Sequence, residues 1–180
     1  MPNGGAWKWS EAICGLVGTL TEELVDADAM ARDGKAEIRV LSAIMKQYQQ
    51  LLTDENLIDF AKIQTECYRL LKDNPQILSD LQEKIHYLMI DEYQDTNYIQ
   101  EQIVFMLGEK YGNICVVGDD DQGLYRFRGA TIRNILEFPN KFENGACKVI
   151  PLTVNYRSNS DIVDFYNDCL LYTSPSPRDC

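Results

Sequence analysis

The sequence has very little histidine and no long hydrophobic run. A single histidine, His86, and six cysteines without a C-x-x-C spacing leave no zinc site of the usual kind. No window approaches about 18 consecutive apolar residues, and the N-terminus lacks the pattern of a signal peptide, so neither a transmembrane helix nor secretion is expected. Scattered cysteines suit small apolar positions in a core, and we expect reduced thiols in a cytoplasmic protein.

A strong positive charge is also missing. The chain of 180 residues carries a net charge of −11, whereas a protein that coats nucleic acid non-specifically needs clustered Lys and Arg. A local basic groove remains compatible with this balance, so charge alone does not identify a partner. With 45% hydrophobic and 10% aromatic residues, the chain can bury a core. Its length suits one domain or parts of two.

Residues 1–83 are predicted to be mainly helical. Apolar residues recur there at helical spacing in three long stripes and one short stripe. The stripes run from Ile13 to Val25, Ile38 to Leu52, Phe60 to Leu71 and Ile77 to Leu81. The first is expected to end near Asp33-Gly34, and the third is stopped by Asn74-Pro75. Packing is the simplest role of such stripes. We therefore expect a helical region at the N-terminal side of residue 84.

From Ile85 onward, the pattern predicts strands that alternate with helices. The expected strands are 86–90, 114–117 and 148–152, and the expected helices are 98–107, 130–138 and 158–166. Ser158 or Asn159 is the expected N-cap of the last helix. Such alternation is typical of a parallel sheet with helices on both faces, so the predicted fold class is α/β. Residues 171–180 contain two prolines and are expected to form an unstructured tail, which resembles translated vector sequence.

Two of the predicted strands end in acidic residues. Asp91 and Glu92 follow the first strand, and residues 118–122 (Gly-Asp-Asp-Asp-Gln) follow the second. Open α/β sheets bind ligands at the carboxyl ends of their strands. Because Mg²⁺ carried by a nucleotide takes one or two protein carboxylates, Asp91 is a candidate metal ligand. Glu92 is a candidate base for an attacking water, and Gln122 can both donate to and accept from a phosphate oxygen or a water.

Aromatic and basic side chains mark two further strings. Residues 125–128 (Tyr-Arg-Phe-Arg) interleave aromatic rings with arginines, which suits single-stranded nucleic acid through base stacking and phosphate contacts. Tyr156 and Arg157 lie between the third predicted strand and the last helix. An arginine in such a place can stabilise a transferring phosphoryl group, and Tyr156 can stack on a nucleobase.

Taken together, these strings resemble the UvrD/Rep-type superfamily 1 DNA helicases. Residues 91–97 are similar to motif II of that family, 118–130 to motif III and 152–158 to motif IV, in the family's order. The resemblance covers roughly residues 58–168. It implies ATP-driven movement along single-stranded DNA, usually 3′ to 5′, with unwinding of duplex junctions.

The resemblance also implies a domain organisation and a role for each candidate residue. Residues 1–83 would be part of a 1B-like accessory region, 84–150 the C-terminal part of a first RecA-like motor domain, and 151–170 the start of a second. The implied catalytic residues are Glu92, Gln122 and Arg157. The residues implied in binding Mg-ATP are Asp91 (the metal ligand), Gln122, Tyr156 and Arg157. The residues implied at the single-stranded DNA groove are Tyr125, Phe127 and Arg128.

The sequence departs from the family pattern at several points. Phe127 stands where many members have Trp, and Gly123 stands where many have Ser. No Gly-x-x-x-x-Gly-Lys-Ser/Thr phosphate loop occurs, and the later motifs of the second motor domain are missing. We therefore expect a fragment whose partners include the missing N- and C-terminal parts of the same polypeptide, and which is inactive in isolation.

Two other interpretations remain open from the sequence. One is a metal-dependent nuclease that uses Asp91, Glu92, Asp95 and Asp119. The other is a remnant without catalytic activity that binds a partner through its acidic helical half. The nuclease hypothesis predicts cleavage of nucleic acid without ATP, and it leaves Gln122 and Arg157 without a role.

Overall fold

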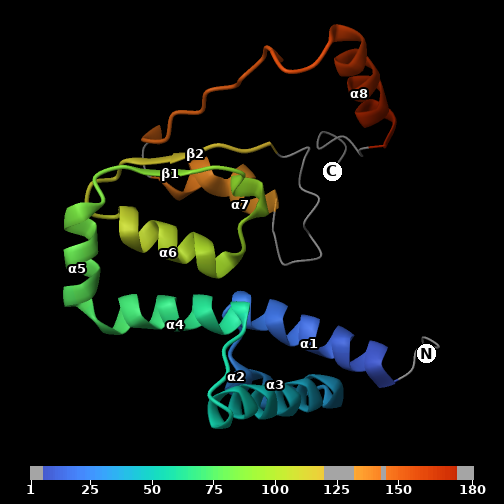
Figure 1. Cartoon of the computed structure of the whole chain (residues 1–180), viewed down its shortest axis with the longest axis vertical. Coiled ribbons are helices and arrows are strands. Elements are labelled where there is room, and N and C mark those ends of the chain that lie inside the picture. The colour runs from blue at the N-terminus through green and yellow to red at the C-terminus, as the bar shows by residue number, and fades with distance from the viewer. Residues whose placement is uncertain (1–5, 120–131, 143–144, 174–180) are drawn as a thin grey trace. The chain divides into compact units, whose positions relative to one another are not determined.

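The computed structural model describes residues 6–119, 132–142 and 145–173, and the chain divides into two compact units, Met1–Lys141 and Phe142–Cys180. The first unit holds α1 (Ala6–Glu22), α2 (Ala27–Ala31), α3 (Ala36–Asp54), α4 (Phe60–Asp73), α5 (Pro75–Lys84), β1 (Leu88–Ile90), the 3₁₀ turn η1 (Tyr93–Asp95), α6 (Tyr98–Gly108), β2 (Ile114–Val116), α7 (Ile132–Glu137) and the 3₁₀ turn η4 (Phe138–Lys141) (Figure 1). The second holds α8 (Ser160–Thr173). Within the described ranges, no helix combines the length and apolar character that crossing a bilayer requires.

The predicted helical stripes are found as helices, with one interruption. Helices α3, α4 and α5 contain the second, third and fourth stripes. The first stripe is divided, because α1 ends at Glu22 and Leu24 adopts a φ of 53°. Asp26 then caps α2 by accepting the N–H of Asp28 at 2.7 Å. The expected end of the first helical run near Asp33-Gly34 is therefore wrong.

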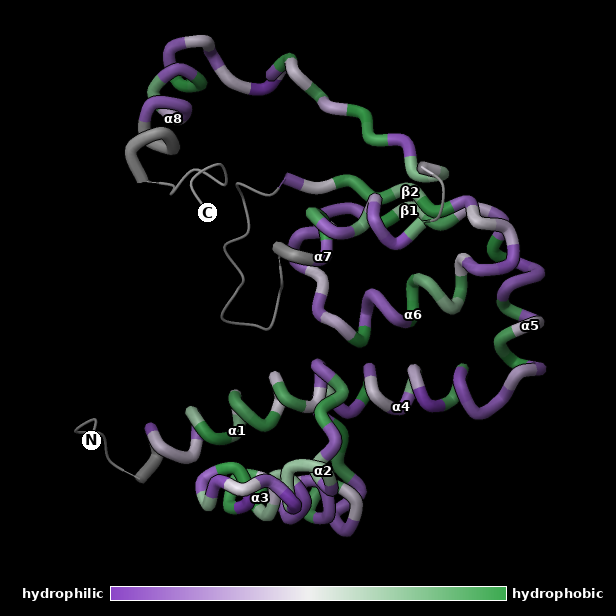
Figure 2. The backbone as a smooth tube through the Cα atoms, turned by 180° about the vertical axis from the view of Figure 1, so that it is seen from behind, coloured by the Kyte–Doolittle hydropathy of each residue, from purple (hydrophilic) through white to green (hydrophobic). Residues whose placement is uncertain are grey.

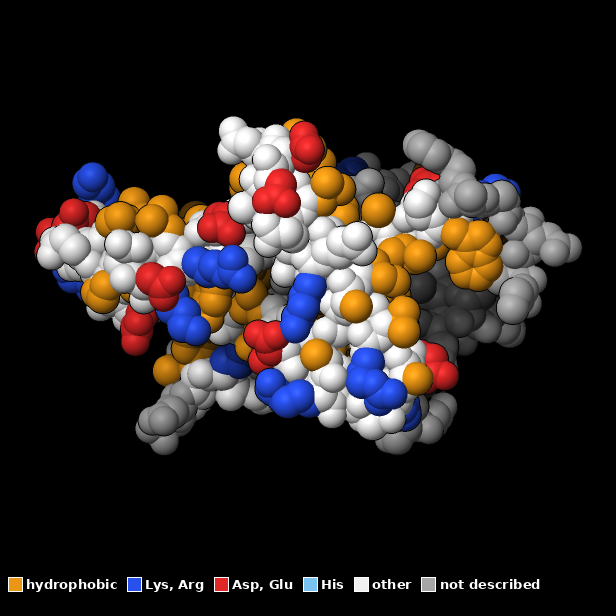
Figure 3. Space-filling view, turned by 90° about the horizontal axis from the view of Figure 1, so that it is seen from below, with side chains coloured by type: hydrophobic (Ala, Val, Ile, Leu, Met, Phe, Trp, Pro, Cys, Tyr) orange, Lys and Arg blue, Asp and Glu red, His pale blue; other side chains and the backbone are white. Residues whose placement is uncertain are grey.

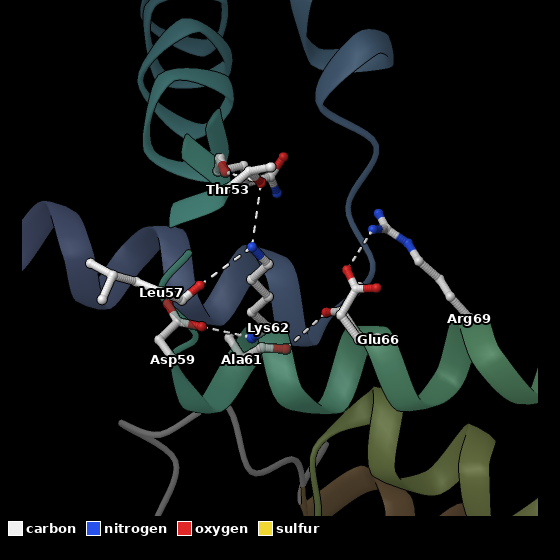
Figure 4. Close-up of polar contacts among 9 residues, drawn as sticks. Thr53, Leu57, Asp59, Ala61, Lys62, Glu66 and Arg69 are labelled. Atoms are coloured by element: carbon white, nitrogen blue, oxygen red, sulfur yellow. Dashed lines mark hydrogen bonds and ion pairs between the residues drawn. The ribbon is translucent and has the colours of Figure 1, made fainter. Parts of the chain in front are cut away.

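The start of α4 is tied to the end of α3. Asp59 caps α4 by accepting the N–H of Lys62 at 2.6 Å, and it also accepts the Tyr48 hydroxyl at 2.8 Å. The Lys62 ammonium donates to the Thr53 hydroxyl at 3.3 Å and to the Leu57 carbonyl at 3.4 Å (Figure 4). Burial, and secondly the bond to Asp59, raise the pKa of Tyr48 to about 12. The phenol therefore keeps its proton and this bond at neutral pH.

Charged side chains of both signs share the surface. On the face shown in Figure 3, Lys and Arg side chains are interspersed with Asp and Glu rather than gathered apart from them. Lys46 pairs with Asp28 at 2.5 Å, and Arg69 pairs with Glu66 at 3.1 Å, in both cases with substantial solvent exposure. Exposed pairs of this kind contribute up to about 1 kcal/mol each, so the helices depend mainly on their apolar contacts.

Strands β1 and β2 form a parallel sheet of two strands. Their register pairs Leu88 with Ile114, Met89 with Cys115, and Ile90 with Val116. Both strands are hydrophobic along their length (Figure 2). One face lies against α6, where a Cβ on Gly108 would meet the Ile114 side chain at 2.5 Å. Met89 and Cys115 point to the other face and are exposed. The predicted α/β class with a parallel sheet is confirmed.

Two predictions for the later residues need correction. Residues 148–152 were expected as a strand, but among the described residues only β1 and β2 pair, and Val149 and Leu152 are exposed. A strand needs a neighbouring strand that supplies its backbone hydrogen bonds, and an apolar sequence does not specify such a neighbour. The unstructured tail was predicted to begin at residue 171, which is too early because α8 continues to Thr173. Residues 174–180 lie outside the described residues. The last helix itself is confirmed, and Asn159 accepts the N–H of Asp161 at 3.3 Å.

An ion pair between the buried Glu101 carboxylate and the partly exposed Lys141 ammonium fastens η1 and η4 to α6. The Glu101 side chain is 1% exposed, accepts the Tyr93 hydroxyl at 3.1 Å and pairs with the Lys141 ammonium. The ammonium also lies 5.5 Å from the centroid of the Phe105 ring, and Phe138 packs against both the Tyr93 and Phe105 rings. Burial and the neighbouring Glu101 carboxylate raise the pKa of Tyr93, which therefore stays a donor. The cluster holds η1 in a fixed place beside the sheet.

Breaking this pair is expected to destabilise the first unit strongly. Lys141→Met keeps the length and the apolar stem but leaves the Glu101 carboxylate buried without a counter-charge. We expect the free energy of unfolding to fall by about 3 kcal/mol, measured by urea titration with circular dichroism. The control Arg69→Met removes an exposed pair and should cost less than about 1 kcal/mol. A Lys141→Met variant as stable as the parent would show that the pair contributes little.

Candidate functional site

The acidic ends of the two strands lie at the same edge of the sheet. Because β1 and β2 are parallel neighbours, their carboxyl ends meet. The hydrogen bonding continues beyond the strands, since Val117 donates its N–H to the Ile90 carbonyl at 2.8 Å and accepts the N–H of Tyr93 at 2.9 Å. Asp91 and Glu92 form the short loop between these two contacts, which brings both carboxylates to the open edge.

The backbone of Glu92 departs from strand geometry at the acidic pair. Glu92 adopts a left-handed conformation, with φ 50° and ψ 44°, which costs a residue with a side chain about 1–2 kcal/mol. This turn ends the strict alternation of side chains along the strand. The N–H of Glu92 donates to Asp91 Oδ1 at 3.0 Å, and both side chains are exposed. Strained backbone of this kind is frequent at functional sites.

Gln94 joins the two strand ends through its side chain. Gln94 is 1% exposed; its Nε2 donates to Glu92 Oε2 at 2.7 Å, and its Oε1 accepts the N–H of Asp119 at 3.0 Å. Gly118 permits this close approach, because a Cβ at that position would overlap Gln94 Oε1 and would lie 2.7 Å from the Ile135 side chain. Gln94 was not among the predicted site residues, although it belongs to the Asp-Glu-x-Gln-Asp string that follows the first strand.

The residues after η1 are anchored by three helices. Asn134 of α7 donates to the Thr96 carbonyl at 3.1 Å. Asn97 forms a capping box with Gln100 at the start of α6, with bonds of 3.0 and 3.1 Å. The Asn97 amide also donates to Gln64 of α4 at 2.8 Å. The loop that carries the acidic pair therefore continues into a segment with little freedom to move.

Three carboxyl groups around this anchor have raised pKa values. Burial is the main cause at Glu22, Glu23 and Asp95. The charge of Glu92 adds to the effect at Asp95, whereas the Asn97 amide opposes it at Glu22. Between the unfolded and the folded pKa of each group, the native state binds more protons than the unfolded state. The contribution of these groups to the free energy of unfolding therefore falls as the pH rises through that window.

A neutral side chain at position 22 is expected to remove part of this pH dependence. Glu22→Gln should raise the free energy of unfolding near neutral pH, because the amide avoids burying a charge and can still bond Asn97. The gain should shrink as the pH is lowered toward the ordinary glutamate pKa of 4.5. Urea titrations across this pH range measure the difference, with the exposed Glu11→Gln as control. A gain that does not change with pH would exclude burial of the charge as its cause.

Tyr156 and Arg157 belong to the second unit, just ahead of α8. The Asn155 side chain accepts the N–H of Arg157 at 2.9 Å and that of Ser158 at 3.0 Å, which forms an Asx turn. Tyr156 is 92% exposed, and Arg157 is exposed as well. Both side chains are therefore accessible to a ligand from a turn whose backbone is fixed locally.

The predicted site residues thus fall into three groups. Asp91 and Glu92 lie with Asp119 at one sheet edge, whereas Tyr156 and Arg157 lie in the other unit. Gln122, Tyr125, Phe127 and Arg128 lie outside the described residues. The described ranges contain no group of three or more His, Cys, Asp or Glu side chains able to hold a metal ion. A single exposed Asp91 carboxylate fits Mg²⁺ that arrives with a nucleotide, since such an ion keeps phosphate and water ligands.

Comparison with known proteins gives consistent matches over this region. Residues 6–143 match the family model of the UvrD/REP helicase N-terminal domain. The chain is 36% identical over 160 residues to the ATP-dependent DNA helicase PcrA of Bacillus subtilis (strain 168), covering 88% of this chain and 21% of that protein. It is 43% identical over 125 residues to a probable DNA helicase II homolog of Rickettsia felis, covering 69% of this chain and 19% of that protein. The chain spans about a fifth of the length of these relatives.

Proposed function

Because the chain belongs to the UvrD/Rep helicase family, we propose that it supplies the hydrolytic edge of the nucleotide site in an ATP-dependent DNA helicase. The observation that carries the proposal is the shared edge of β1 and β2, where the exposed Asp91 and Glu92 carboxylates lie beside the backbone of Asp119. A phosphoryl-transfer site needs an acid pair that is both accessible and held in place. This edge has both properties.

Each residue of the site has a distinct role in this proposal. Glu92 accepts a proton from the water that attacks the γ-phosphorus, a general-base role worth about 10²–10⁴ in rate. Asp91 would hold Mg²⁺, which would neutralise charge on the phosphate oxygens. Gln122 contacts the γ-phosphate, Arg157 stabilises the charge that develops on its oxygens, and Tyr156 stacks on adenine. Glu92, Gln122 and Arg157 are thus the proposed catalytic residues.

The proposed DNA contacts come from the segment that follows β2. Tyr125 and Phe127 stack on bases of single-stranded DNA, and Arg128 contacts a phosphate. Hydrolysis would drive movement along the strand, 3′ to 5′ by family resemblance, toward duplex junctions. A cytoplasmic setting is part of the proposal, and the described cysteines Cys14, Cys67, Cys115 and Cys147 are free thiols, as a reducing compartment requires.

A chimera provides the direct test. Residues 6–173, from the start of α1 to the end of α8, would replace the corresponding segment of the Bacillus subtilis relative, whose name describes an ATP-dependent DNA helicase. We expect the chimera to hydrolyse ATP faster when single-stranded DNA is added, whereas the 180-residue chain alone does not hydrolyse ATP. A folded chimera that binds ATP without hydrolysing it would contradict the proposal, and metal-dependent cleavage of DNA without ATP would favour a nuclease.

A further inference from the structure

We propose that Gln94 is a positioning residue that holds the Glu92 carboxylate and the backbone of Asp119 as one unit. Through these two contacts of Gln94, the position of the chain after β2 would determine the position of the Glu92 carboxylate. The catalytic meaning of this inference rests on the proposed function. Its geometric part concerns only two hydrogen bonds within the first unit, so it can be tested on the chain itself.

The chemistry of the two contacts requires an amide at this position. One side of the Gln94 side chain must donate to a carboxylate, at 2.7 Å from Glu92 Oε2, and the other must accept a backbone N–H, at 3.0 Å from Asp119. A carboxylate cannot donate in its charged form, and an apolar side chain can do neither. Because the side chain is 1% exposed, water does not readily replace either bond, and losing one would leave a buried group unsatisfied.

The surroundings of Gln94 make the connection stiff. Its own turn, η1, is fixed by the bond from the Tyr93 N–H to the Val117 carbonyl, at 2.9 Å, and by the buried contact between Tyr93 and Glu101. Gly118 packs so closely that a Cβ there would overlap Gln94 Oε1. A shift of the backbone at Gly118 and Asp119 therefore acts directly on the Gln94 amide, and through it on Glu92.

Glu92 has a specific need for such a support. Its side chain is exposed and its backbone is left-handed, so neither burial nor a regular strand fixes the carboxylate. Gln94 is the one neighbouring side chain for which a hydrogen bond to that carboxylate is found in the described residues. A misplacement of about 1 Å can cost roughly a hundredfold in rate, so loss of this bond is expected to slow turnover.

The functional test compares Gln94→Met with a matched glutamine variant in the chimera. Methionine has a similar length but cannot form either bond. We expect kcat for ATP hydrolysis to fall by about tenfold to a hundredfold, with KM for ATP unchanged, since the Gln94 side chain is 1% exposed and both of its hydrogen bonds are made within the protein. The control is Gln82→Met, because Gln82 is half-buried and donates to the Met106 carbonyl at 2.7 Å, away from the strand ends. Gln82→Met should keep the parental kcat.

A second measurement tests the geometry without relying on catalysis. In the 180-residue chain, hydrogen exchange of the Asp119 amide should become faster in Gln94→Met, while the amides bonded within the sheet, such as that of Val117, keep their protection. Unchanged exchange at Asp119 would overturn the inference. So would a Gln94→Met chimera with parental kcat, or one that changes KM alone. If the parental chimera does not hydrolyse ATP, the proposed function fails, and the exchange at Asp119 still decides whether Gln94 holds this unit.

Discussion

In the chimera, Arg157→Ala is expected to lower kcat for ATP hydrolysis by about 10³–10⁵-fold, the range for an arginine that stabilises charge on a transferring phosphoryl group. The physical basis is the exposed Arg157 guanidinium on a turn that the Asn155 side chain fixes through two backbone bonds. The turn fixes the backbone that carries the side chain, and the exposed guanidinium is accessible to the negative charge that develops on the γ-phosphate oxygens. Steady-state ATP hydrolysis in the presence of single-stranded DNA measures the effect.

Two further variants make the result for Arg157 interpretable. Arg157→Lys keeps the charge but loses the planar fork, so we expect it to recover only part of the rate. Arg39→Ala removes an exposed arginine of α3 whose guanidinium donates to the carbonyl groups of Asp33 and Gly34, and it should leave hydrolysis unchanged. A kcat for Arg157→Ala within about twofold of the parent would remove Arg157 from the site.

Local patterns were sufficient to predict the two paired strands and the acidic residues at their ends. The apolar runs ending at Ile90 and Val117 specify strands because they are short, continuous and followed by polar residues. The intervening helix makes a parallel pairing the natural arrangement. Once the strands are parallel neighbours, their ends must meet, so the proximity of Asp91 and Asp119 follows from topology alone.

Contacts between distant residues could not be predicted in the same way. The bond from Asp119 to Gln94 joins positions 25 residues apart, and no local pattern specifies which polar side chain turns inward. The left-handed backbone at Glu92 has no signal either, because that conformation is usually associated with glycine. Residues 148–152 illustrate the opposite error, since an apolar run is a strand only when another strand lies beside it.

Glu92→Gln is expected to reduce ATP turnover in the chimera by about 10²–10⁴-fold while leaving ATP binding nearly unchanged. The amide keeps the size of the side chain but cannot accept a proton from the attacking water. Its amide oxygen can still accept the hydrogen bond from Gln94 Nε2, which lies 2.7 Å from Glu92 Oε2 in the parent. The loop should therefore keep its geometry. Binding of ATP is measured by equilibrium titration, and the chemical step is measured in a single turnover.

The matched control for this variant is Glu109→Gln, which neutralises an exposed carboxylate at the end of α6 and should retain full turnover. The comparison separates two roles for Glu92. If Glu92 is the base, the single-turnover rate falls and the affinity for ATP is retained. If Glu92 only supports the loop, Glu92→Gln should retain both quantities, because its amide oxygen still accepts the bond from Gln94, whereas Gln94→Met should lose the rate. A Glu92→Gln variant with parental single-turnover rate would refute the base assignment.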